Sequence, residues 1–118
     1  MAAGLGTRMK SNVAKVLHKL DGRPLISHVC RSALALNPRK VVVIVGHQAD
    51  EVRAVVEEEF ASERDRIAFV QQLKQRGTGD AVIAADSELR GDNRTVLVLS
   101  GDVPLIRPGT LTKLIEAH

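Results

Sequence analysis

Several residue types are scarce in this sequence of 118 residues, and each scarcity excludes a class of protein. The single cysteine, Cys30, cannot form an internal disulfide, so a small secreted domain stapled by disulfide bonds is excluded. There is no tryptophan or tyrosine, and there are only two phenylalanines. Because proteins use aromatic side chains as platforms for stacked bases, we expect no nucleic-acid partner.

Long apolar segments are absent as well. No apolar run approaches the ~20 residues that a membrane-spanning helix needs, and no apolar signal core follows the N-terminus. Apolar residues still make up 44% of the chain and charged residues 26%, which suffices for the core of one small domain over residues 1–118. We therefore expect a soluble, cytoplasmic domain without a membrane partner.

Positive charge is concentrated at the start of the chain. Residues 1–40 contain eight Lys or Arg and one acidic residue, a balance of +7, whereas residues 41–118 contain nine basic and 13 acidic residues, a balance of −4. This asymmetry indicates an anionic partner near the first third of the chain. Because glycines are interleaved with these charges, a compact polyphosphate fits better than a nucleic acid.

Continuous apolar runs alternate with amphipathic patterns along the chain. Strands are predicted at residues 41–45, 67–70 and 95–99. The first and last of these lack polar alternation, which is typical of parallel strands buried on both faces. Helices are predicted at residues 24–36, 49–60, 79–89 and 108–117, with Pro24 at the first position of its helix. The pattern predicts an α/β, Rossmann-like fold, a mostly parallel sheet with helices on both faces.

This fold is expected to be incomplete. The segment Gly4–Arg8 has the composition of the loop that follows the first strand of such folds, yet no strand precedes it. In a Rossmann-like order that strand is central, between residues 41–45 and residues 95–99. We therefore expect marginal stability and weak nucleotide affinity at most.

The first candidate site is the segment Ala2–Met9 together with Lys15. Small residues let successive backbone N–H groups cradle phosphate oxygens, while Arg8 adds a bidentate guanidinium and Lys15 a point charge. The spacing fits neither a Walker loop nor a G-x-G-x-x-G fingerprint. A flexible, glycine-rich start with solvated cations would explain the same residues, so both interpretations stay open at this point.

Two further candidate segments follow predicted strands, at the edge where α/β sheets bind ligands. Asp102, in Ser100–Leu105, is a lone carboxylate of the kind that suits Mg²⁺, although it could simply cap a turn. In Gln72–Asp80, a Gly-Thr-Gly turn opens a helix, and the glutamine amide could read a base edge, although an ordinary capping turn has the same sequence. Together the three segments would supply a phosphate-binding loop, a turn that reads a base and a carboxylate for a metal ion, which are the groups that nucleotidyl transfer needs.

Other reactive residues indicate no separate site. The four histidines are not spaced as metal ligands are, and a single cysteine is too few for a zinc site of cysteine and histidine ligands. Cys30 lies on the apolar face of the first predicted helix, as a small core residue would.

The order of these segments resembles the signature of the sugar-1-phosphate nucleotidyltransferases. The similarity is carried by Ala2–Met9, Lys15–His18, Gly22–Leu25, Val45–His47, Gln72–Gly79 and Leu99–Leu105. It is closest to the N-terminal uridylyltransferase half of the bacterial bifunctional enzymes that make UDP-N-acetylglucosamine. The resemblance runs along the whole chain. It implies that the first strand and the C-terminal half of that domain, as well as the acetyltransferase half, are missing here.

The resemblance implies a role for each residue at the start of the chain. Backbone groups would hold the base and phosphate of the nucleotide at Met1, Ala2, Ala3 and Gly4. Arg8 and Lys15 would be the catalytic residues, since they would neutralise the triphosphate and the charge that develops during transfer.

The later segments acquire roles in the same way. Gln72, Gly77 and Thr78 would read uracil. Ser100 and Gly101 would line the sugar-phosphate site, and Asp102 would bind the Mg²⁺ cofactor.

The implied reaction joins UTP and N-acetylglucosamine 1-phosphate to give UDP-N-acetylglucosamine, a cell-wall and lipopolysaccharide precursor, and pyrophosphate. Full-length relatives would be homo-oligomers through the missing C-terminal half. Two departures stand out: Ala14 replaces a proline, which loosens the approach to Lys15, and Asp80 replaces a histidine after Gly-Thr-Gly. A different base or sugar phosphate, or a non-catalytic nucleotide-binding fragment, therefore stays open.

Overall fold

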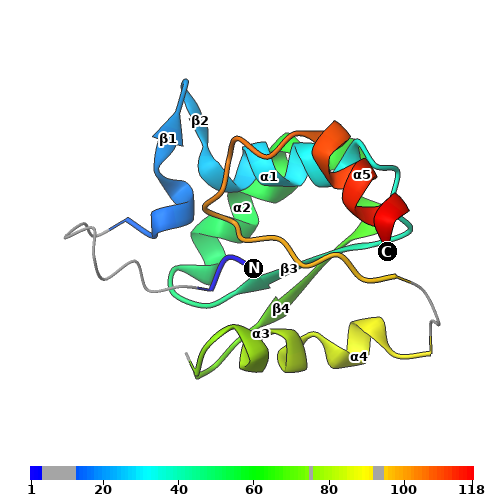
Figure 1. Cartoon of the computed structure of the whole chain (residues 1–118). Coiled ribbons are helices and arrows are strands. Elements are labelled where there is room, and N and C mark those ends of the chain that lie inside the picture. Colours follow the sequence, from blue (N-terminus) through cyan, green and yellow to red (C-terminus); the bar gives the residue numbers. More distant parts are fainter. Residues whose placement is uncertain (4–12, 75, 92–94) are drawn as a thin grey trace.

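The computed structural model describes residues 1–3, 13–74, 76–91 and 95–118. Its central feature is the parallel pair of β3 (Val41–Val45) and β4 (Ile67–Gln71), in which Val45 lies opposite Gln71 (Figure 1). Both strands were predicted, and β4 is one residue longer than expected. The connection between them contains α2 (Ala49–Glu59) and the 3-10 helix η2 (Ala61–Arg66).

Residues 1–3 lie against the other edge of β3. The N–H of Ala2 donates to the Ile44 carbonyl at 2.7 Å, and Ala2 forms a parallel bridge with Val45. On the far side, the amino group of Met1 donates to the Leu99 carbonyl at 2.7 Å, and the N–H of Gly101 donates to the Met1 carbonyl at 2.8 Å. Residues 1–3 therefore occupy the central position predicted for a first strand.

These hydrogen bonds set the order of segments across the sheet. The order is β4, β3, residues 1–3 and residues 95–101, the last of which joins through Leu99 and Gly101 only. Numbered by their place in the sequence, these segments read 3-2-1-4, which is the order of a Rossmann half-sheet. The order reverses between residues 1–3 and residues 95–101. In open α/β sheets the ligand crevice lies at this reversal.

The strand predicted at residues 95–99 is the one element that the structure does not form. From Thr95 to Val98, no backbone hydrogen bond is present within the described residues. Val96 and Val98 are 52% and 49% exposed. Their β-branched side chains favour an extended chain, but the neighbouring residues 1–3 provide backbone hydrogen-bond partners only at Met1. The ladder is therefore restricted to Leu99 and Gly101.

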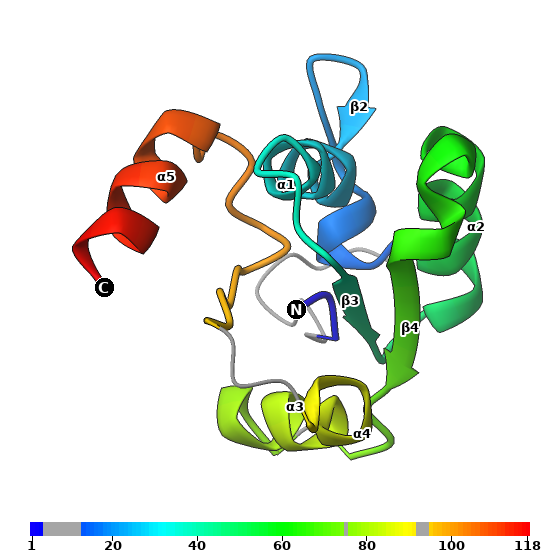
Figure 2. The ribbon, with the colours of Figure 1, turned by 90° about the vertical axis from the view of Figure 1, so that its right-hand side faces the viewer.

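Helices cover both faces of the sheet, as predicted (Figure 2). α1 (Leu25–Leu34) and α2 lie on one face, and α3 (Thr78–Ala84) and α4 (Asp86–Leu89) lie on the other. Alternate residues of β3 supply the two cores: Val43 and Val45 pack on the α1 and α2 side, whereas Ile44 packs with Ala81 and Ala85 on the other side. The α/β, Rossmann-like fold class is confirmed.

Two helix predictions are wrong in detail. The helix predicted over residues 79–89 is divided at Ala85 into α3 and α4, where the Ala85 N–H donates to the Val82 carbonyl three residues earlier, as in a tighter turn. Pro24 does not begin α1. It ends the short strand β2 (Arg23–Pro24), which pairs with β1 (Lys19–Leu20), and its extended backbone leads into a helix that ends at Leu34 rather than residue 36.

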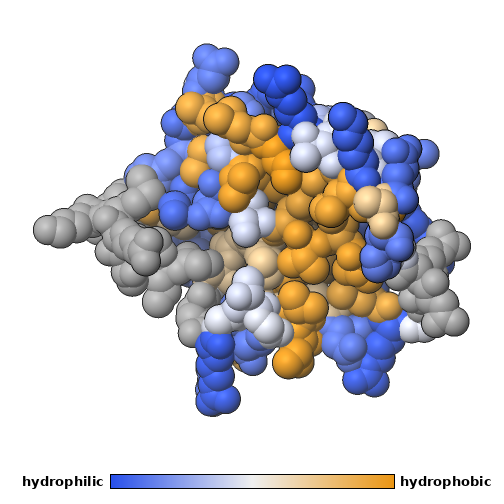
Figure 3. All heavy atoms as spheres, in the orientation of Figure 1, coloured by the Kyte–Doolittle hydropathy of each residue, from blue (hydrophilic) through white to orange (hydrophobic). Residues whose placement is uncertain are grey.

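The C-terminal helix α5 (Pro108–Ala117) has its predicted bounds, with Pro108 in its first turn. Only Leu111 of this helix is buried, whereas Leu114 and Ile115, expected on the same inward face, are exposed. Figure 3 shows a broad apolar surface over α5 and the segment before it. Its large exposed side chains are Val96, Val98, Val103, Leu105, Leu114 and Ile115. Within the described residues, no helix is long and apolar enough to cross a membrane.

Glu59, at the end of α2, links three elements. Its Oε1 lies 3.2 Å from Arg23 Nε of β2 and 3.0 Å from Arg31 Nη2 of α1. Burial alone would raise the pKa of this carboxyl, but the Ser27 hydroxyl, the Arg31 hydrogen bond and the charges of both arginines lower it overall. A lowered carboxyl pKa stabilises the fold above the unfolded pKa. This stabilisation is lost as the pH falls through the folded pKa.

We expect Glu59→Gln to lower the free energy of unfolding at pH 7 by about 0.5–1 kcal/mol, because two partly exposed arginines lose their anionic partner. The difference from wild type should begin to shrink below the ordinary carboxyl pKa of 4.5 and vanish only once the pH has fallen through the lower folded pKa. Urea denaturation between pH 7 and pH 3 measures it. Glu58→Gln is the matched control, since Glu58 is exposed on the same helix without an ion pair to described residues. A loss that does not change with pH would contradict this account.

Gly101 lies where no side chain fits. An added Cβ would be 2.7 Å from the Met1 carbonyl oxygen and 3.2 Å from Val16 Cγ1. We expect Gly101→Ala to cost about 1–3 kcal/mol of stability, since Met1 cannot move without losing its bond to Gly101. Gly109→Ala is the control, because nothing lies within 4 Å of a Cβ there. Equal melting temperatures for the two variants would refute the steric argument.

Candidate functional site

The candidate residues follow the segments that end at the carboxyl edge of the sheet. The pairing register places Ala2, Val45 and Gln71 in one row. Ala3 and Gln72 thus lie one residue beyond that row, roughly 10 Å apart, because neighbouring strands are about 4.8 Å apart. In Figure 1, the chain leaves residues 1–3, β3 and β4 on the same side of the sheet.

An ion pair joins two of the candidate residues at the reversal of strand order. Lys15 Nζ lies 2.9 Å from Asp102 Oδ2, and the two side chains are 40% and 35% exposed. Lys15 begins the 3-10 helix η1 (Lys15–Leu17), and Asp102 follows Gly101 at the end of the segment that pairs with Met1. The sequence predicted each residue from a separate motif. The structure brings them into direct contact where solvent reaches both.

A hydrogen bond holds the backbone just before Lys15, whereas the sequence predicted a looser backbone there. Ala14 is buried, and its N–H donates to the side-chain Oε1 of Gln48, which precedes α2. A proline at position 14 could not make this hydrogen bond because it has no N–H. Val16 is buried in the core next to it. Sequence reasoning missed Gln48, since no local pattern relates it to residue 14.

Most backbone groups of residues 1–3 are already used inside the sheet. Both polar groups of Met1 and the N–H of Ala2 bond to neighbouring segments. The N–H of Ala3 has no partner within the described residues, so this donor of the stretch is not used inside the sheet. The other predicted contacts of this loop, Gly4 and Arg8, lie outside the described residues.

Gln72 is held firmly beside the start of α3. It is 5% exposed, and its backbone N–H donates to the Val45 carbonyl at 2.7 Å. Its Nε2 donates to the Gly77 carbonyl at 3.3 Å and to Asp80 Oδ2 at 3.0 Å. Gly77 has φ +101, which favours glycine, and Gly77 and Thr78 are both exposed. The three residues predicted to read a base therefore lie at one place, where Gln72, just after β4, bonds to Gly77 at the start of α3.

The remaining predicted residues differ in what they can offer. Ser100 is exposed next to the ion pair, whereas Gly101 is buried and its N–H is used by Met1, so Gly101 spaces the segments rather than presenting a group to a ligand. Burial raises the pKa of the Cys30 thiol to about 11. Cys30 is thus an unreactive core residue, in agreement with its position in the sequence pattern. The described residues contain no cluster of three or more His, Cys, Asp or Glu side chains that could hold a metal ion.

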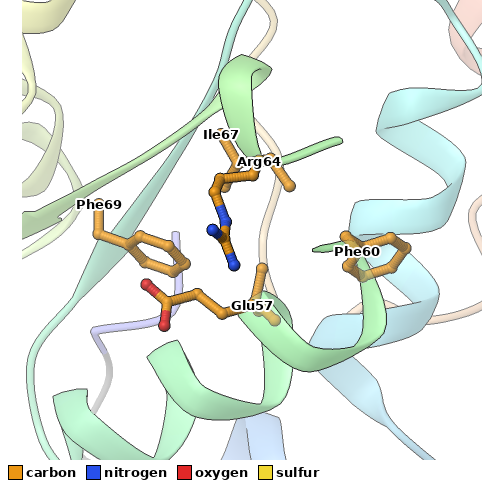
Figure 4. Close-up of a pocket in the computed structure, with 6 residues that line it drawn as sticks. Glu57, Phe60, Arg64, Ile67 and Phe69 are labelled. Carbon is orange, nitrogen blue, oxygen red and sulfur yellow. The ribbon is translucent and has the colours of Figure 1, made fainter. Parts of the chain in front are cut away.

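A small pocket between α2 and β4 is separate from these residues (Figure 4). Its volume is about 70 Å³, and Arg64 projects between Phe69 and Glu57 within it. Small-molecule sites usually measure about 300–1,000 Å³. The pocket is therefore too small for a nucleotide, and none of the candidate residues lines it.

Known proteins resemble this chain along its whole length, including the segments that carry the candidate residues. The chain is 46% identical over all 118 residues to the bifunctional protein GlmU of Streptococcus pyogenes serotype M3 and 45% identical to that of Corynebacterium diphtheriae. It covers 24% of the length of each of these proteins, so it spans about a quarter of the curated relatives it matches. The family model of the MobA-like NTP transferase domain matches residues 1–118. With the strand order 3-2-1-4 and a whole-chain match, this chain belongs to the MobA-like NTP transferase family.

Proposed function

We propose that this chain carries the nucleotide-binding part of a uridylyltransferase site that converts UTP and N-acetylglucosamine 1-phosphate into UDP-N-acetylglucosamine and pyrophosphate. The observation that carries the proposal is the Lys15–Asp102 ion pair at the reversal of strand order. Family membership supports a nucleotide substrate, and the similarity to GlmU over the whole chain supports a sugar phosphate as acceptor. The choice of UTP rests on the Gln72–Gly79 motif.

The ion pair has the charges that phosphate chemistry requires. Lys15 offers an ammonium point charge, which binds phosphate oxygens well. Asp102 holds this ammonium when no substrate is bound. When a triphosphate enters with a divalent cation, Lys15 would turn to the phosphate oxygens and Asp102 to the cation. Each charged group exchanges one partner for another, so neither is left uncompensated in the crevice.

Asp102 fits Mg²⁺ as a single carboxylate contact. Mg²⁺ is commonly held by one or two carboxylates together with phosphates and several retained waters. Oδ2 of Asp102 faces Lys15, and its other oxygen has no partner within the described residues. The 35% exposure of the side chain leaves space for retained waters. When bound, Mg²⁺ would supply neutralisation of the triphosphate charge.

The chemistry needs positioning rather than a protein nucleophile. In the proposed reaction an oxygen of the sugar phosphate attacks the α-phosphorus in line, and the bond to pyrophosphate breaks. Positioning and electrostatic stabilisation account for most catalysis in phosphoryl transfer. Lys15 would stabilise the negative charge that develops on the phosphate oxygens. The single thiol, Cys30, is buried in the core, and burial raises its pKa, so it is poorly suited to act as a covalent catalyst.

Replacing Asp102 by Asn tests the proposed cation contact. In the presence of Mg²⁺ we expect Asp102→Asn to weaken UTP binding about tenfold, since a charged metal contact is lost. In EDTA the same variant should bind UTP equally well or better, because a carboxylate that repels the triphosphate is gone. Isothermal titration in both buffers measures the two affinities, with Asp65→Asn, an exposed residue of η2, as the control. Equal weakening in both buffers would rule out a metal contact.

We expect residues 1–118 alone to give no turnover. The backbone from Thr95 to Val98 has no hydrogen-bond partner among the described residues, so this side of the crevice lacks the support that a positioned site requires. The apolar side chains around it are exposed, which favours association of the chain. The measurement is pyrophosphate release from UTP, Mg²⁺ and N-acetylglucosamine 1-phosphate, with a full-length GlmU relative as the positive control. Steady turnover together with a cooperative thermal melt would contradict this expectation.

A further inference from the structure

The carboxamide of Gln72 is held by two groups that can only accept hydrogen bonds. Its Nε2 lies 3.0 Å from Asp80 Oδ2 and 3.3 Å from the Gly77 carbonyl oxygen. A carboxamide nitrogen carries two N–H donors, and its oxygen is an acceptor only. Neither a carboxylate nor a backbone carbonyl can bond to the oxygen end. The two contacts therefore determine which end of the amide faces α3 and leave Oε1 as the group open to a ligand.

The two acceptors form a rigid unit with the sheet. Gly77 and Asp80 belong to the same turn, which is closed by a hydrogen bond of 3.2 Å from the Ala81 N–H to the Gly77 carbonyl. Ala81 is buried against Ile44 of β3. Gln72 itself is bonded to β3 through its backbone and is 5% exposed. Rotation of the amide by 180° would place its oxygen against the Asp80 carboxylate, where two acceptors repel each other.

We infer that Asp80 is a positioning residue that orients the Gln72 carboxamide and thereby determines base selectivity; this inference rests on the proposed function. With Oε1 presented, the site accepts a hydrogen bond from a base that carries a ring N–H. Uracil has such a donor at N3, whereas N3 of cytosine is itself an acceptor. Asp80 thus favours UTP over CTP through Gln72, without touching the base.

The inference also gives a role to a residue that departs from the family pattern. Asp80 stands where a histidine is expected after Gly-Thr-Gly. Sequence reasoning noted only the negative charge that it brings to this loop. The contact joins Gln72, just after β4, to Asp80 in α3, so the periodicity of a single helix or strand does not relate the two residues. The structure was needed to show the pairing.

The test compares Asp80→Ala with Asp80→Asn in the 118-residue chain. Dissociation constants are measured for UTP, CTP and inorganic tripolyphosphate by isothermal titration. We expect Asp80→Ala to reduce the ratio of UTP to CTP affinity about tenfold, since one orienting hydrogen bond is lost. Asp80→Asn should retain most of the ratio, because its amide oxygen still accepts from Gln72. Binding of tripolyphosphate, which has no base, should be the same in all variants, and Asp65→Ala is the surface control.

The outcomes separate this inference from the proposed function. Failure of the wild-type chain to bind UTP, or tighter binding of CTP than of UTP, would overturn the proposed function and the inference with it. A wild-type preference for UTP that persists in Asp80→Ala would overturn the inference alone. An equal loss of preference in Asp80→Asn and Asp80→Ala would show that charge rather than amide orientation matters, and would overturn it as well.

Discussion

The candidate site depends on the hydrogen bonds that Met1 and Ala2 make to both of their neighbours in the sheet. Ala2 bonds to Ile44 of β3 on one side, and Met1 bonds to Leu99 and Gly101 on the other. Through these contacts the segment that carries Asp102 is aligned with the rest of the sheet. Because Gly101 has no side chain, its backbone can approach Met1 closely enough for this alignment. The Lys15–Asp102 contact follows from it.

Most of the fold could be predicted from the sequence because its local signals and its long-range contacts agree. The β-branched run Val41–Val45 forms a strand that is covered on both faces, and the buried residues of α2 follow its apolar periodicity. Residues 95–99 carry the same signal as β3, but within the described residues only Leu99 of this run pairs with a neighbour. A strand exists only where a neighbour supplies hydrogen bonds. The division at Ala85 could not be predicted either, since alanine favours helices and the local sequence carries no signal for a break there.

The residues of the candidate site were easier to predict than their contacts. Lys15, Gln72 and Asp102 each stand in a motif whose composition indicates its chemistry. Their partners depend on strand order and on the geometry of turns, which no spacing reveals. The tether from Gln48 to Ala14 joins residues 34 positions apart. It connects the turn after β3 to the helical turn that carries Lys15, so the lysine and the sheet edge are positioned by one network.

The bond between Met1 and Leu99 spans 98 positions of the sequence, and this has a consequence for how the chain folds. Contacts between distant residues slow folding because the entropy of loop closure must be overcome before the contact forms. The unit from β3 to β4 closes a much shorter loop, since Val41 pairs with Ile67 only 26 positions away, and it can form earlier. On a ribosome that adds about 5–20 residues per second, residues 1–3 would wait on the order of 5–20 seconds for their partner at Leu99. Residues 1–3 thus reach their final position late, and during that interval the central edge of β3 is open to other chains.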